Sequence, residues 1–136
     1  MEGEVYLNYS IKSDLKLVQP TVAEIIGKLK RTVKKETLLT DLRLCLEEAL
    51  INAIKHGNQQ KRELEVNIEV KQRGRRVEFR VSDKGKGFDT TNIPDPTEKN
   101  NLQRPSGRGI FLIKKIMDEV RFFDGGRTIF MLKYLD

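Results

Sequence analysis

Residues 36–56 read ETLLTDLRLCLEEALINAIKH, and the fold prediction starts from them. Their apolar side chains recur every three or four residues, the spacing that collects side chains on one face of an α-helix. The stretch therefore predicts an amphipathic helix, and Gly57-Asn58 directly after it is typical of a helix end. The apolar face consists of Leu39, Leu42, Leu46, Ala49, Leu50 and Ala53.

Two β-hairpins are predicted on the C-terminal side of this helix. LEVNIEV at 64–70 and RVEFRVS at 76–82 alternate apolar and polar side chains, which is typical of strands with one buried face. Arg73-Gly74-Arg75 between them predicts a turn. A second pair of strands is expected at about 120–124 and 127–134, joined by a glycine-rich turn.

Between the two hairpins, the sequence predicts a loop and then a helix. Residues 84–106 contain three of the four prolines, which favours a loop. Helical spacing returns in IFLIKKIMDEV at 110–120, directly after Gly107-Arg108-Gly109. We therefore expect these glycines to open the helix.

At the N-terminal end, the alternating stretch EVYLNYSI at 4–11 predicts a strand. Ser13 or Asp14 can cap a helix that continues to about Arg31. Pro20 lies within it and either kinks the helix or occupies its first turn, because proline lacks the N–H of an interior position. The sequence leaves both alternatives open.

Helices that alternate with antiparallel hairpins predict a two-layer α/β sandwich, with helices on one face of the sheet. A chain of 136 residues with 38% hydrophobic composition fits a single domain, residues 1–136. Charges interrupt every apolar run well before the roughly 20 residues that span a bilayer, and MEGEVYLNYS does not resemble a secretion signal. We expect a soluble cytoplasmic protein.

Cysteine content and charge point to no further chemistry. Cys45 is the only cysteine, so we expect a buried apolar side chain, with neither an internal disulfide nor a thiolate metal cluster. The net charge of +6 suggests an anionic partner, but 26 basic residues alternate with 20 acidic ones along the whole chain. Nucleic-acid binding favours a basic stripe with stacking aromatic residues, so we expect no direct nucleic-acid partner.

The first chemically distinctive pair is Glu48 and Asn52, four residues apart on the predicted helix. This spacing places a carboxylate and a carboxamide one above the other, as a candidate general base and an oxygen ligand for Mg²⁺. Taken alone, the pair is explained more simply as part of a solvated polar face of the helix. Glu47 points about 100° away from Glu48. His56 continues the same stripe, where a favourable interaction with the helix dipole explains it equally well.

A second distinctive stretch, Asp83-Lys84-Gly85-Lys86-Gly87, follows a predicted strand. Its glycines lack a Cβ and so let a flat ligand approach the backbone, while Asp83 can accept a hydrogen bond from an exocyclic amine such as that of adenine. A simple turn explains the same residues. The third stretch, Gly107-Arg108-Gly109, precedes a predicted helix, whose free N–H groups and dipole favour a phosphate.

In this order, the three stretches resemble the N, G1 and G2 boxes of the GHKL ATPases, the superfamily of gyrase, chaperone, histidine-kinase and mismatch-repair ATPases. The resemblance covers roughly residues 5–134, and MDEV with Gly126-Arg127-Thr128 is similar to the bacterial anti-sigma-factor serine kinases. It implies a Bergerat-type sandwich with a mixed, mostly antiparallel sheet. The matching residues are Glu48-Ala49-Leu50-Ile51-Asn52-Ala53, Asp83-x-Gly85-x-Gly87 and Gly107-x-Gly109-x-x-Leu112.

The resemblance also implies a role for each matching residue, with ATP and Mg²⁺ as cofactors. Glu48 would be the base and Asn52 the Mg²⁺ ligand. Asp83 would accept from the adenine amine, and Gly85 and Gly87 would shape the base pocket.

The remaining implied roles concern the phosphates and the adenine edge. Gly107, Arg108 and Gly109 would cradle the phosphates, and Thr128 would bond to the adenine side or to a bridging water. Residues 88–106 correspond to the ATP lid of the family. Within that lid, Arg104 and Lys99 are candidate phosphate contacts.

The function implied is that of a serine-protein kinase and anti-sigma factor in a partner switch. Such proteins form homodimers, hold a sigma factor inactive, and phosphorylate a serine of a STAS-type antagonist, the anti-anti-sigma protein. We expect this chain to resemble that stand-alone branch. The alternative that the residues leave open is a protein-binding regulator that uses ATP without phosphotransfer.

Overall fold

The computed structural model describes residues 4–86 and 105–135. The strands are β1 (Val5–Lys12), β2 (Glu65–Arg73), β3 (Arg76–Ser82), β4 (Glu119–Phe123) and β5 (Thr128–Tyr134). The α-helices are α1 (Val18–Leu29), α2 (Glu36–Asn52) and α3 (Pro105–Ile116). Shorter helical turns are η1 (Leu15–Leu17), η2 (Ala53–Gly57) and η4 (Asp124–Gly126).

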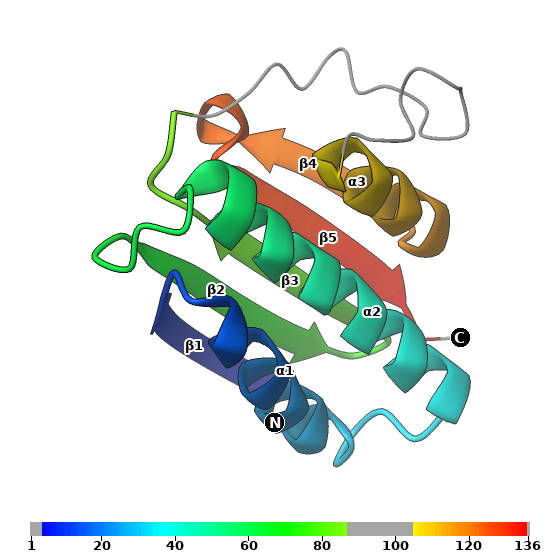
Figure 1. Ribbon diagram of the computed structural model, residues 1–136. Coiled ribbons are helices and arrows are strands. Elements are labelled where there is room, and N and C mark those ends of the chain that lie inside the picture. The colour runs from blue at the N-terminus through cyan, green and yellow to red at the C-terminus, as the bar shows by residue number, and fades with distance from the viewer. Residues whose placement is uncertain (1–3, 87–104, 136) are drawn as a thin grey trace.

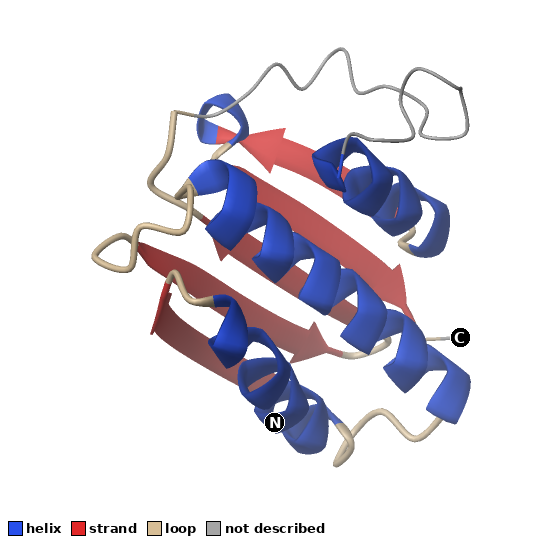
Figure 2. Ribbon diagram, in the orientation of Figure 1, coloured by secondary structure: helices blue, strands red, loops and turns tan. Residues whose placement is uncertain are grey.

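The strands form one sheet in the order β1-β2-β3-β5-β4, and the α-helices cover one of its faces (Figure 1). The predicted two-layer α/β sandwich is confirmed, with α2 lying between α1 and α3 (Figure 2). Every pairing between the described strands is antiparallel, whereas the expectation allowed a mixed sheet.

The core lies between the sheet and the helices, as the alternation of side chains predicts. In β2 the apolar side chains are fully buried while most of their polar neighbours face outward, with Gln72 as a buried exception, and β3 repeats the alternation. The centre of α2 supplies Leu42, Leu46 and Leu50, none of which is exposed. Cys45 is buried among them, as expected.

The N-terminal helix resolves the alternative at Pro20. The turn η1 comes first, capped by the Asp14 side chain, which accepts a hydrogen bond from the Lys16 N–H at 3.0 Å. α1 then begins at Val18, so Pro20 is its third residue. Proline is tolerated there because the first N–H groups of a helix have no partner within the helix.

The end of α2 differs from the prediction. The helix widens into the π-helical turn η2 before it stops, and Gly57 does not adopt the left-handed conformation of a terminating glycine. The left-handed residues are Gln59 and Gln60, with φ of 53° and 59°. Within residues 4–86 and 105–135, no helix is long and apolar enough to cross a membrane.

Candidate functional site

Glu48 and Asn52 lie one turn apart on α2, half-buried on the side that faces α3. Burial raises the pKa of the Glu48 carboxyl above its ordinary value; the charge of Glu47 adds to this rise and Arg108 opposes it. A raised pKa makes the carboxylate a better proton acceptor near neutral pH. Glu47 thus acts on the Glu48 carboxyl through its charge.

The side chain of Asn52 ends in an amide whose hydrogen bonds the described residues do not complete. Its Nδ2 atom is buried and has no hydrogen-bond partner among the residues that the structure describes. Leaving such an atom unpaired costs about 1–3 kcal/mol, so an ordered water or a ligand oxygen is expected to accept from it. The same carboxamide also carries an oxygen, the ligand type that Mg²⁺ prefers.

The surroundings of Asn52 fit a cation held partly by a substrate. In the described part of the chain, no three His, Cys, Asp or Glu side chains gather closely enough to hold a metal ion. Mg²⁺ is commonly bound by one or two protein oxygens together with substrate phosphates. The side-chain oxygen of Asn52 is one protein ligand of the type that such an ion uses.

The glycines of α3 are placed differently from the prediction. α3 begins at Pro105, so Gly107, Arg108 and Gly109 lie inside the helix instead of in front of it. The N–H groups without a partner in the helix are therefore those near its start, including that of Gly107. Arg108 is exposed, and its charge acts on Glu48.

Gly109 is needed for the close approach of α3 to α2. A Cβ at this position would lie 2.8 Å from Glu48 Oε2 and 3.0 Å from Asn52 Nδ2. Both separations are shorter than a carbon atom normally accepts, so a larger residue would push α3 away or displace the pair. The structure thus brings Gly109 together with Glu48 and Asn52, as a packing partner.

Asp83 lies in the loop after β3, half-buried beside the end of α2. Its backbone N–H donates to the Arg127 carbonyl at 2.9 Å, and its Oδ1 accepts from the Gly85 N–H at 2.8 Å. Burial raises the pKa of the Asp83 carboxyl; the Gly85 hydrogen bond and the charge of Arg127 oppose that rise. Among the described residues, Oδ1 is the carboxylate oxygen for which a hydrogen bond is found.

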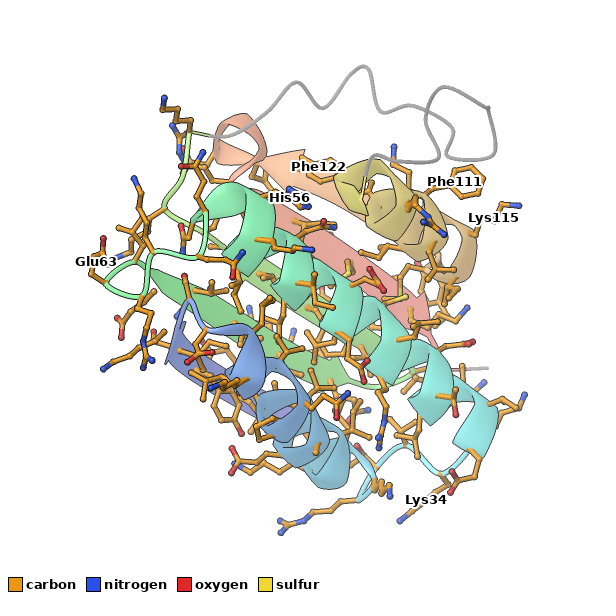
Figure 3. The ribbon with its side chains drawn as sticks, in the orientation of Figure 1. Lys34, His56, Glu63, Phe111, Lys115 and Phe122 are labelled. Carbon is orange, nitrogen blue, oxygen red and sulfur yellow. The ribbon has the colours of Figure 1, made fainter. Side chains whose placement is uncertain are left out.

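Gly57 is a site residue that sequence reasoning took only for a helix end. It follows Asn52 by five residues, the spacing of π-helical hydrogen bonds, so the wide turn carries it to the Asp83 loop. A Cβ at Gly57 would overlap the Asp83 carboxylate, and one at Gly85 would overlap the Gly57 carbonyl. His56 is exposed on this turn (Figure 3).

Asn58, also unassigned from the sequence, joins three segments of the chain by side-chain hydrogen bonds. It is almost fully buried. Its Nδ2 donates to Ser13 Oγ at 2.9 Å and to the carbonyls of Leu64 and Glu65 at 3.2 Å each. Its Oδ1 accepts from the Lys84 N–H at 2.7 Å, which fixes the loop that carries Asp83.

Thr128 lies at the start of β5, beside the last residue of β3. Its hydroxyl is 2.8 Å from Ser82 Oγ, and Ser82 directly precedes Asp83. The structure therefore brings Thr128 to the Asp83 loop. Gly87, Lys99 and Arg104 lie outside the described residues.

Two chemically different groups are thus aligned along the second half of α2. Glu48 and Asn52 pack against Gly109 of α3. The Asp83 carboxylate packs against Gly57 and Gly85 at the π-helical turn. A family model described as histidine kinase-like ATPase domain matches residues 11–133. The chain belongs to this family.

Curated relatives of this histidine kinase-like ATPase domain agree with the predicted branch. It is 31% identical over 105 residues to the serine-protein kinase RsbW of Listeria monocytogenes, which covers 72% of this chain and 67% of that protein. It is 30% identical over 142 aligned residues to the anti-sigma F factor of Anoxybacillus flavithermus, covering 99% and 94%. The serine-protein kinase RsbW of Staphylococcus aureus is 34% identical over 105 residues, covering 71% and 66%.

Proposed function

We propose that this chain is a MgATP-dependent serine-protein kinase and anti-sigma factor that works in a partner switch. The observation that carries the proposal is the half-buried Glu48 beside Asn52, whose buried amide Nδ2 has no partner among the described residues. The relatives named serine-protein kinase and anti-sigma F factor support the same function. We further propose a sigma factor and a STAS-type antagonist as partners, a homodimeric assembly, a role in transcription regulation and a cytoplasmic location.

Each site residue then has a task in holding ATP. Asp83 Oδ2 accepts from the adenine amine, because Oδ1 is already engaged by Gly85. Gly57 leaves space at the Asp83 carboxylate, and the Thr128 hydroxyl lies at the same edge. The free N–H groups at the start of α3 favour the phosphates.

Glu48 acts on the protein substrate. Its carboxylate accepts the proton of the partner's serine hydroxyl, and that oxygen forms a bond to the γ-phosphorus while the bond to the departing ADP oxygen breaks. Asn52 holds Mg²⁺, which neutralises charge on the phosphates when bound. The positive charge of Arg108 acts on the Glu48 carboxyl. We assign to Arg108 the stabilisation of the negative charge that develops on the phosphoryl group during transfer.

Radiolabelled phosphoryl transfer from ATP to the STAS-type protein tests this function. Glu48→Gln keeps the size of the side chain but removes the base, so we expect transfer to fall by at least about a hundredfold while ATP binding is kept. Glu47→Gln is the matched control: it removes a neighbouring charge that raises the pKa of Glu48 but leaves the base in place, so transfer should stay within a few fold of the natural rate. Transfer by Glu48→Gln at the natural rate would remove Glu48 as the base, and binding without transfer by the natural protein would favour the non-catalytic alternative.

A further inference from the structure

Arg127, which lies between η4 and β5, makes three hydrogen bonds with the loop from Asp83 to Lys86. Its Nε donates to the Gly85 carbonyl at 2.6 Å, and its Nη2 donates to the Lys86 carbonyl at 3.3 Å. Its own carbonyl accepts from the Asp83 N–H at 2.9 Å. Nη1 donates to the Asp124 carbonyl at 2.9 Å, which fixes the side chain at its other end.

Among the described residues, Arg127 and Asn58 both hold the backbone of this loop. The Lys84 N–H is held by Asn58, and the groups on either side of it are held by Arg127. A planar guanidinium with five donors in a fixed arrangement can hold two successive carbonyls, which a flexible ammonium does less well. The side chain of Arg127 is 35% exposed, so it is not part of the apolar core.

We propose that Arg127 is a positioning residue of the nucleotide site, which holds the loop from Asp83 to Lys86 in the geometry that presents Asp83 to the base. The inference rests on the proposed function and deepens it. The sequence showed only an arginine beside Thr128. The structure shows that its guanidinium reaches across to the loop that follows β3.

The positive charge of Arg127 also favours the ionised form of Asp83, the form that the proposed contact with the base needs. The charged side chains that act on the Asp83 carboxyl are Arg127, which favours its ionised form, and Asp124, which opposes it. From the wide turn, the group against Asp83 is Gly57, which has no side chain. Only the ionised carboxylate can accept from the Gly85 N–H with Oδ1 and from an amine with Oδ2 at the same time, so removing Arg127 should make binding more sensitive to acid.

Two variants separate charge from geometry. Arg127→Gln removes both the positive charge and the planar guanidinium, and Arg127→Lys keeps only the positive charge. The matched control is Arg121→Gln, since Arg121 lies on β4, pairs with Glu119 and makes no described bond with the loop. The readouts are the NMR titration of the Asp83 carboxyl in nucleotide-free protein and the dissociation constant for ATP between pH 5 and 8.

For Arg127→Gln, we expect the Asp83 titration to move to higher pH and ATP binding at pH 7 to weaken about tenfold, more at lower pH. Arg127→Lys should titrate like the natural protein but bind ATP more weakly, and Arg121→Gln should change neither property.

Three results would overturn the inference. An Arg127→Gln variant with unchanged titration and affinity would do so while leaving the proposed function intact, because the natural protein would still bind ATP. A glutamine variant that no longer folds would make Arg127 a determinant of the fold instead of the site. A natural protein that binds no ATP would remove the proposed function, and this inference with it.

Discussion

At the scale of single residues, the environment of Glu48 lowers the stability of the fold at neutral pH. The structure buries half of a carboxyl group beside a second glutamate, and both features disfavour its charge. Its pKa is raised in the folded protein, so the carboxyl favours folding below the unfolded value of about 4.3 and loses that contribution as pH rises through the folded pKa. At neutral pH, the charged form therefore destabilises the fold.

A glutamine at this position should relieve that cost. We expect Glu48→Gln to raise the free energy of unfolding at pH 7 by roughly 0.5–1 kcal/mol, a common gain when a functional residue is replaced. The gain should shrink as pH falls through the folded pKa of Glu48 and disappear near pH 4. Urea denaturation at several pH values measures it, and a gain that grows toward acid would contradict the assigned environment.

The sequence identified Glu48, Asn52 and Asp83 because each lies in a short pattern with recognisable chemistry. Gly57 and Asn58 escaped, because their partners are far away in the chain: Gly57 meets Asp83, and Asn58 joins three separate segments. A glycine that is required for close approach looks the same in a sequence as one that ends a helix.

At the scale of elements, the end of α2 is shaped for its contact with the Asp83 loop. The π-helical turn is a feature often found at functional sites, and here it carries Gly57 to the carboxylate. Periodicity predicted a regular helix up to His56, because one inserted residue at the last turn leaves almost no trace in the apolar pattern.

Gly57→Ala tests this contact between elements. The added methyl group would overlap Asp83, so we expect a loss of about 1–3 kcal/mol in the free energy of unfolding together with weaker ATP binding. The control is Gly27→Ala on α1, where a Cβ meets nothing within 4 Å. It should instead stabilise the protein by about 0.5–1 kcal/mol. An equally harmless Gly57→Ala would rule out the close packing.

α3 shows how packing overrides local preference. Two glycines suggested that the helix starts after them, yet α3 begins at Pro105, a residue well suited to a first helical position. Contact with α2 offsets the poor helix preference of Gly109. At the other end, Glu119 and Val120 leave the predicted helix because they pair with β5.

At the scale of the molecule, the layered architecture followed from the sequence more completely than the order of the strands. Each predicted hairpin gave one neighbouring pair, β2 with β3 and β4 with β5. The pairing of β3 with β5 brings the two hairpins together across α3, and no local pattern specifies it. This pairing places Thr128 and Arg127 beside the Asp83 loop, so it is what completes the site.

The central claim is that these elements together form a MgATP site. Isothermal titration of the protein with ATP, with and without Mg²⁺ and alongside Asn52→Ala, tests it most directly. We predict one saturable site per chain that binds more tightly with Mg²⁺, and a loss of at least about tenfold in the MgATP affinity of Asn52→Ala. No binding by the natural protein, or Mg²⁺-dependent binding that the alanine variant retains in full, would contradict the account.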